Sequence, residues 1–251
     1  MLKLLLGVGA VCVLVGLAQT FMGVDQVARW VVAPSLPALP GRDLPRSGNW
    51  AGYTATSGRF SAVSATWVVP GFAPDSPAGA DAIWVGIGGV RGNDLIQAGT
   101  QETVSGRGST QYAAWIETLP QASHPVPLAV NAGDSITISI EQQTDDAWRV
   151  VLVNNTTTQS YQTNVQYRSS LSSAEWIVEA PSARRGRLVP LDTFGSVSFS
   201  QASTVKDGQS VTIAQAGGRP VTMIGRVGRA LAQPSALGDE GASFTVQQSV
   251  L

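Results

Sequence analysis

The segment Ser135-Ile136-Thr137-Ile138-Ser139-Ile140-Glu141-Gln142 alternates between apolar and polar residues. Successive side chains of a β-strand point to opposite faces, so the isoleucines share one face and Thr137, Ser139 and Glu141 the other. A run with this period is typical of a strand that buries one face. The sequence therefore predicts a half-buried strand over residues 135–142.

Similar alternation recurs on both sides of this segment. The runs that show it are Phe60–Val69, Trp148–Val153, Thr163–Tyr167, Ser196–Phe199, Ser210–Ile213 and Ser243–Val246. Turn-forming residues such as Gly133-Asp134 and Asp207-Gly208 separate them. Because almost no segment has a helical period, roughly a dozen short strands predict an all-β fold, either a β-sandwich or a jelly roll.

The N-terminal segment has a different character. Lys3 is followed by an apolar run to Ala18, which is the layout of an export signal. The run is shorter than the roughly 20 apolar residues that a membrane-spanning helix needs, although Phe21 and Met22 can extend it. We expect residues 1–23 to be a signal peptide, with a retained membrane anchor as the alternative, and the protein to be secreted or extracytoplasmic.

Prolines follow at positions 34, 37, 40 and 45, where they block both helix formation and strand pairing. Residues 24–46 are therefore predicted to be an extended linker or a pro-segment. Residues 47–251 are expected to form one domain, because an all-β domain of about 200 to 250 residues is ordinary.

Composition limits the partners of this chain. Charged residues make up 13% of the 251 residues and the formal net charge is −1, so the chain lacks the basic patch that nucleic acid or an anionic surface would require. We expect a monomer that acts on another kind of partner. Cys12 is the only cysteine and lies in the N-terminal apolar run, so the rest of the chain can form no internal disulfide.

The residue inventory excludes several mechanisms. The only histidine, His124, precedes a proline in a turn-like segment, which argues against a serine or cysteine triad. A zinc site needs several His or Cys ligands, and no glycine-rich phosphate loop opens a helix. We therefore expect no metal and no cofactor, and the chemistry that remains is that of carboxylates and carboxamides.

Two short apolar runs are each interrupted by polar side chains: Leu95-Ile96-Gln97-Ala98-Gly99 and Ala174-Glu175-Trp176-Ile177-Val178-Glu179. Gln97 and Gly99 share a strand face, and the missing side chain of Gly99 predicts a gap or a close approach beside Gln97. Glu175 and Glu179 also share a face, about 13 Å apart, which is too far for both to act on one bond. From the strand period alone, either glutamate can be the functional one.

Six ordered motifs carry a resemblance. They are Asn49-Trp50-Ala51-Gly52-Tyr53, Trp84-Val85-Gly86-Ile87, Leu95–Gly99, Tyr112-Ala113-Ala114-Trp115-Ile116-Glu117, Asn155-Thr156-Thr157-Thr158-Gln159 and Ala174–Glu179. In order and spacing they resemble the motifs of the glutamic peptidases, the eqolisin or G1 family, here in a bacterial-type homologue. The resemblance runs from about Ser47 to about Phe199.

This resemblance implies a concanavalin-like sandwich of two curved antiparallel sheets with a substrate groove on a concave face. It also implies an endopeptidase that cleaves polypeptides, at acidic pH, with Gln97 and Glu179 as the catalytic pair acting directly on water. One departure is Gly88, where fungal members have an aspartate, and a second is the lack of disulfides.

Other residues are candidates for supporting roles. The tryptophans Trp50, Trp67, Trp84 and Trp115 are candidates to line a peptide groove, although core packing is expected for at least two of them. Glu117 is a candidate partner of the catalytic pair, and Glu175 a neighbour that shapes the groove.

Two other functions remain open from the sequence. A jelly-roll carbohydrate-active enzyme or a lectin-like binding module would also place glutamates and tryptophans on a concave sheet. A retaining glycosidase, however, needs two carboxyl groups about 5 to 5.5 Å apart, whereas the expected partner of Glu179 is an amide. The second of these functions is a domain that binds without catalysis, and the presence of Gln97 together with Glu179 argues against it.

Overall fold

The computed structural model describes residues 46–249, apart from residues 74, 107–108 and 183–186. The predicted signal segment 1–23, and the linker 24–46 except for Arg46, lie outside the described residues. In the part of the chain that is described, no helix is long and apolar enough to cross a membrane.

The regular structure of the described residues consists of β-strands. Their bounds are β1 Arg46–Ser47, β2 Trp50–Ala55, β3 Phe60–Val68, β4 Gly79–Gly88, β5 Leu95–Val104, β6 Thr110–Thr118, β7 His124–Pro125, β8 Ser135–Gln142, β9 Ala147–Asn154, β10 Gln159–Gln166, β11 Ala174–Glu179, β12 Ser196–Lys206, β13 Gln209–Thr212, β14 Arg219–Ile224, β15 Ala230–Pro234 and β16 Phe244–Gln248. The strand predicted over residues 135–142 is confirmed with the same bounds. His124, expected in a turn, lies instead in the short exposed strand β7.

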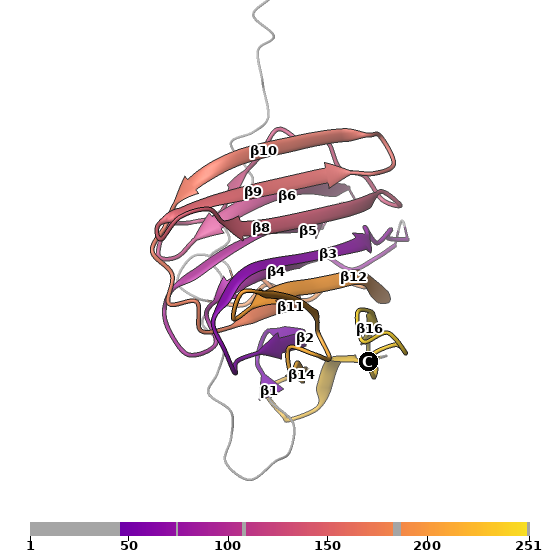
Figure 1. Ribbon diagram of the computed structural model, residues 1–251. Helices are drawn as coiled ribbons and strands as arrows, with labels where there is room; N and C mark the ends of the chain where they lie inside the picture. Colours follow the sequence, from indigo (N-terminus) through magenta and orange to yellow (C-terminus); the bar gives the residue numbers. More distant parts are fainter. Residues whose placement is uncertain (1–45, 74, 107–108, 183–186, 250–251) are drawn as a thin grey trace, which may run out of the picture.

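The strands form two layers, and the hydrogen-bonded pairing of neighbouring strands continues from one layer into the other. The order of neighbouring strands is β10-β9-β8-β3-β12-β16-β15-β14-β2-β11-β4-β5-β6-β7. Strands β10, β9, β8, β3 and β12 make one layer, and β11, β4, β5 and β6 lie behind it (Figure 1). Neighbouring strands are antiparallel, except that β1 pairs in parallel with β14. The all-β sandwich predicted from the sequence is therefore confirmed.

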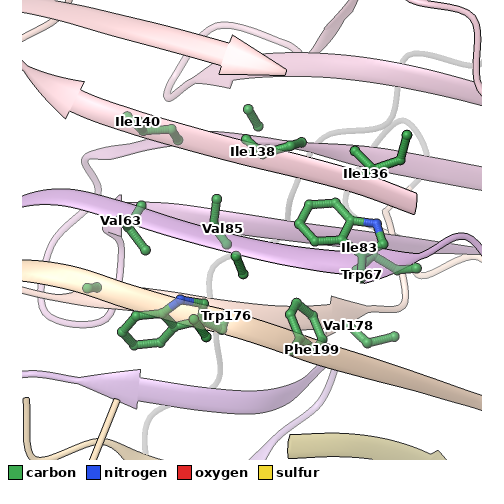
Figure 2. Close-up of a cluster of buried hydrophobic side chains, with 14 of the residues drawn as sticks. Val63, Trp67, Ile83, Val85, Ile136, Ile138, Ile140, Trp176, Val178 and Phe199 are labelled. Atoms are coloured by element: carbon green, nitrogen blue, oxygen red, sulfur yellow. The ribbon is translucent and has the colours of Figure 1, made fainter. Parts of the chain in front are cut away.

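The main core lies between the two layers. Ile136, Ile138 and Ile140 of β8 are fully buried there. They pack beside Trp67 of β3 and Phe199 of β12 in the same layer, and against side chains of β4 and β11 in the other layer, such as Val85 (Figure 2). The alternation of β8 thus has the physical cause expected for a sandwich strand, since one face is removed from water and the other is not.

A second, smaller apolar cluster covers the opposite face of the β2–β11–β4–β5–β6 layer. Its buried members are Trp50, Ala82, Trp84, Leu95, Trp115, Ile177 and Val221. We call this side the outer face of the layer. Side chains on both of its faces are buried, which explains why β4 and β11 lack the regular alternation of apolar and polar residues seen in β8.

Candidate active site

Strand register places Gln97 in a row of polar residues on the outer face. Gln97 of β5 is paired with Glu117 of β6 on one side and with Gly86 of β4 on the other. Gly86 is in turn paired with Glu175 of β11. The row therefore reads Glu175, Gly86, Gln97, Glu117 across four adjacent strands, and all three polar side chains are fully buried.

The Gln97 side chain is clamped at one end. Its Nε2 donates a hydrogen bond to Glu117 Oε2 at 2.5 Å, and Glu117 Oε1 accepts one from the backbone N–H of Ser123 at 2.9 Å. The amide oxygen of Gln97 is buried and accepts no hydrogen bond from a described residue. Because buried polar groups are normally paired, this oxygen is available to a polar partner that is not a protein side chain.

Glu179 lies on the same face at the other end of β11. Its Oε1 accepts a hydrogen bond from Asn49 Nδ2 at 2.9 Å, and its Oε2 accepts one from Trp84 Nε1 at 2.9 Å. Both donors are neutral N–H groups, which stabilise a carboxylate without cancelling its charge. The expected pair partner therefore has a hydrogen-bond donor on each carboxylate oxygen, which offsets part of the cost of burying its charge.

Opposing effects act on the ionisation of Glu179. Burial raises its pKa well above the ordinary value, and the negative charge of Glu117 raises it further. The N–H groups of Trp84 and Asn49 lower it, as does Trp50, whose Nε1 falls short of a hydrogen bond of ordinary geometry. The charge of Glu117 raises the pKa of Glu179, and Glu117 also accepts a hydrogen bond from Gln97. Glu117 therefore links the two residues of the expected pair.

Glu175 has a different environment, although it occupies the row of Gln97. Burial raises its pKa well above the ordinary value, Ser173 lowers it, and the charge of Asp94 raises it. Neither carboxyl oxygen of Glu175 accepts a hydrogen bond of ordinary geometry from a described residue. A carboxyl group that is buried with so few donors favours its neutral form, which does not suit a general base.

Three of the four candidate tryptophans lie on the outer face. Trp50 and Trp84 meet edge to face, with ring centroids 5.1 Å apart and planes at 78°. The indole nitrogens of Trp50 and Trp115 are buried and have no hydrogen-bond partner among the described residues. These N–H groups, together with the Gln97 oxygen, provide unused polar contacts on one face.

The fourth tryptophan, Trp67, does not lie on the outer face. Trp67 of β3 lies in the main core between the layers, where its Nε1 donates to Thr100 Oγ1 at 3.1 Å. The expectation that Trp67 lines a substrate groove is therefore wrong, because its ring fills the interior of the sandwich. The strand period placed its side chain on one face of β3 but could not tell which face was inward.

Gly99 does not leave an open gap beside Gln97. A Cβ added at Gly99 would lie 2.7 Å from Trp84 Cβ and 2.9 Å from Trp115 Cζ2. The close approach predicted at this glycine is therefore made by the protein itself, through the backbone oxygen of Ile83 and two of the candidate tryptophans. Gly99 lets their rings pack over the strand next to Gln97.

At Gly88, where the fungal members have an aspartate, the backbone conformation favours glycine. Its φ of 94° lies in the region that favours glycine, and an added Cβ would lie 2.5 Å from the backbone oxygen of Asp94. The same Cβ would lie 2.9 Å from Asp94 Oδ2. A side-chain carboxylate is therefore present close to this position, but it comes from Asp94.

A further group of buried acids lies away from the outer face. Asp81 and Glu102 are directly paired across β4 and β5, on the side that faces the main core, and Asp192 joins them. Burial, with a contribution from the charge of Asp192, raises the pKa of Glu102 to about 8, and burial raises that of Asp192 to about 7. No group of three or more His, Cys, Asp or Glu within the described residues has the arrangement to hold a metal ion.

Two residues of the site escaped the sequence reasoning. The sequence alone assigns no role to Asn49, although it lies in one of the motifs, and none to Ser47. Asn49 reaches Glu179 across 130 positions of sequence, and Ser47 Oγ donates to Asn49 Oδ1 at 3.0 Å. The only signal in the sequence was the polar Asn49 directly before the apolar strand β2.

The fold is an all-β sandwich, and one of its sheet faces carries a buried carboxyl group and a buried carboxamide. Such a site can activate water without a nucleophilic side chain. Fold and site together therefore define a class of hydrolase. Comparison with known proteins agrees with this class. The sequence pattern of the peptidase A4 family matches residues 48–246, and the chain belongs to that family, the glutamic peptidases.

Individual relatives support the same assignment. The chain is 31% identical over 205 residues to scytalidopepsin B of Scytalidium lignicola, covering 75% of this chain and 77% of the relative. It is 27% identical over 217 residues to aspergillopepsin-2 of Aspergillus niger, covering 77% and 76% respectively.

Solved structures show the same fold. Scytalido-glutamic peptidase with a transition state analog inhibitor superposes with a TM-score of 0.69 and 26% identity, covering 80% of this chain and 98% of that one. Aspergilloglutamic peptidase from Aspergillus niger gives a TM-score of 0.60 and 29% identity, covering 68% and 99%.

Proposed function

We propose that this protein is an endopeptidase in which Glu179 and Gln97 act on a water molecule that attacks the peptide carbonyl. The protein is a glutamic peptidase by family, and peptidases of this family hydrolyse polypeptides. The observation that carries the assignment of the pair is the hydrogen bonding of Glu179, because Asn49 and Trp84 each direct one N–H group at one carboxylate oxygen.

Peptide hydrolysis needs a base for the water, a donor for the developing oxyanion and a proton for the leaving amine. Glu179 in its ionised form accepts a proton from the water and returns it to the amine nitrogen. Gln97 orients the same water through its amide oxygen, which accepts no hydrogen bond from a described residue. One hydrogen of its NH₂ group is engaged by Glu117, and the other is directed to the oxyanion.

Only one member of this pair titrates, because a carboxamide stays neutral at all relevant pH values. Ionisation of Glu179 therefore sets the acid limb of the rate. Because burial raises the pKa of Glu179, this limb lies above the ordinary pKa of a glutamate, and we propose a working range that is only mildly acidic. The scarcity of charged groups on the chain, 13% of its residues, is compatible with such a medium.

The experiment that tests this function uses the purified protein and its Glu179→Gln variant. Each is incubated with a denatured protein and, separately, with polysaccharides, over a range of pH. We expect new peptide termini from internal cleavage of the denatured protein, and none with the variant. Release of sugar without peptide cleavage would instead establish the carbohydrate-active alternative.

A further inference from the structure

The residues that begin the described domain reach directly to the catalytic glutamate. Asn49 is 3% exposed and Ser47 2% exposed, although both precede the first long strand. Asn49 Nδ2 donates to Glu179 Oε1 at 2.9 Å. A buried amide on a carboxylate of this kind is a charge-assisted contact, which is stronger than a hydrogen bond between neutral groups.

Ser47 determines which end of the Asn49 amide faces Glu179. Ser47 Oγ accepts hydrogen bonds from the backbone N–H groups of Trp50 at 3.1 Å and of Asn49 at 3.3 Å. Its own hydrogen is therefore directed to Asn49 Oδ1, at 3.0 Å. Reversing the amide would place Oδ1 against Glu179 Oε1, and two acceptors repel each other there.

The backbone holds this arrangement from both sides. The N–H of Ala180 donates to the carbonyl oxygen of Asn49 at 2.8 Å, directly next to Glu179. Trp50 is the cross-strand partner of Glu179 in the β2–β11 ladder. Strand β1 is paired in parallel with Thr222 and Met223 of β14, so the chain before Asn49 is fixed as well.

We propose that Asn49, oriented by Ser47, is a positioning residue that favours the ionised form of Glu179 against the effects of burial and of Glu117, and that fixes the plane of its carboxylate. Asn49, which precedes β2, and Trp84 of β4 engage different oxygens of Glu179, so the carboxylate cannot rotate without losing one of the two bonds. The inference rests on the proposed role of Glu179 as the base.

The charges around Glu179 determine the direction of the effect. Glu117 from β6 opposes ionisation, whereas β2 and β4 present uncharged residues, namely Trp50, Ala82 and Trp84. Removing the Asn49 donor leaves the effects of burial and of Glu117 less compensated. The carboxylate then forms only at higher pH, so the acid limb of kcat/KM moves upward.

The first measurement is the pH profile of kcat/KM for Asn49→Ala, Ser47→Ala and Ser47→Thr. We expect Asn49→Ala to move the acid limb upward by about one pH unit, the size expected for loss of one hydrogen bond to a charged group. Ser47→Ala should move it in the same direction by less, and Ser47→Thr, which keeps the hydroxyl, should resemble the unaltered protein. The matched control is Asn154→Ala, which also removes a buried amide bound to a carboxylate, Asp134, but in β9.

The second measurement does not depend on activity. The sequence has six glutamates, so ¹³C labelling of their side-chain carboxyls gives a small set of resonances, and Glu179→Gln identifies the one from Glu179. We expect its titration to move upward in Asn49→Ala and to stay in place in Asn154→Ala. A folded Asn49→Ala with unchanged titration and an unchanged acid limb would overturn the inference.

The two measurements also separate this inference from the proposed function. Full activity of Glu179→Gln would contradict the role of Glu179, whatever Asn49 does to its titration. If Asn49→Ala does not fold, the difference between Ser47→Ala and Ser47→Thr decides the matter, since a purely structural role of Ser47 would leave both pH readouts unchanged.

Discussion

Gln97 and Glu175 occupy one cross-strand row with only Gly86 between them, whereas Glu179 lies four residues further along β11. Register alone would therefore pair Gln97 with Glu175. The surroundings favour the other glutamate, because Glu179 has a hydrogen-bond donor on each oxygen and Glu175 has none of ordinary geometry among the described residues.

The first prediction separates the two glutamates. Glu179→Gln keeps shape and hydrogen bonding but removes the base, so the rate should fall by at least roughly 10²- to 10⁴-fold. Glu175→Gln should stay within about tenfold, because Glu175 influences the reaction only through its field and through packing. Steady-state peptide hydrolysis measures both, and circular dichroism confirms folding. An inactive Glu175→Gln beside an active Glu179→Gln would reverse the assignment.

The second prediction concerns the amide of the pair. Gln97→Ala removes the proposed oxyanion donor and should cost on the order of 10² to 10³ in kcat. Gln111→Ala, an exposed glutamine of the neighbouring strand β6, is the control and should be close to unaltered. Equal losses in the two variants would indicate general damage to the sheet rather than a role for Gln97.

The third prediction uses the clamp on Gln97. Glu117→Gln removes the negative charge that raises the pKa of Glu179, so the carboxylate forms at lower pH and the acid limb of kcat/KM moves downward. This direction is opposite to that expected for Asn49→Ala. The pH profile of the variant, compared with that of the exposed Glu141→Gln, provides the measurement, and an upward shift would contradict it.

The fourth prediction concerns the buried acids Asp81, Glu102 and Asp192. The folded state binds protons more tightly than the unfolded state, because the pKa of Glu102 rises from 4.5 to about 8 and that of Asp192 from 3.8 to about 7. Their contribution to stability is thus complete below about pH 4 and is lost as the pH rises to about 8. Melting temperatures measured across this window should fall steadily.

A substitution isolates this effect. Glu102→Gln cannot ionise, so its melting temperature at pH 8 should exceed that of the unaltered protein by on the order of a few degrees. At pH 4, where Glu102 is already neutral, the gain should disappear. A parallel fall in both proteins would show that other groups cause the loss of stability.

The fifth prediction concerns export. We propose that residues 1–23 direct the chain across a membrane and that residues 24–46 cover the active face until they are removed. N-terminal sequencing of the mature form should then show a start close to Arg46 or Ser47. An intact Met1 in the membrane fraction would favour the anchor, and equal activity with and without residues 24–46 would exclude an inhibitory role.

The sequence predicted the strands well where one face is buried and the other is exposed, as in β8. It predicted β12 only as far as Phe199, although the strand continues to Lys206. The pairing of β12 with β3 shifts between Ser200 and Ser203, and Gln201 has a φ of 51°. This irregularity interrupts the alternation on which the prediction depends.

The site was predictable only in part. The contact between Gln97 and Glu117 joins neighbouring antiparallel strands, so a period-two pattern places both residues on comparable faces. The contact between Asn49 and Glu179 joins segments 130 positions apart, and no local pattern encodes which distant strands become neighbours. The direction in which Trp67 points depended on the same unknown pairing.

The parallel pairing of Arg46 and Ser47 with β14 matters for engineering this enzyme. A carrier protein or affinity tag fused directly ahead of Arg46 would lie next to the segment that supports Glu179. The opposite end of the described chain leaves from β16, which pairs with β12 and β15 and makes no ladder with β11. Fusions, immobilisation linkers and display anchors that must preserve turnover therefore belong after β16.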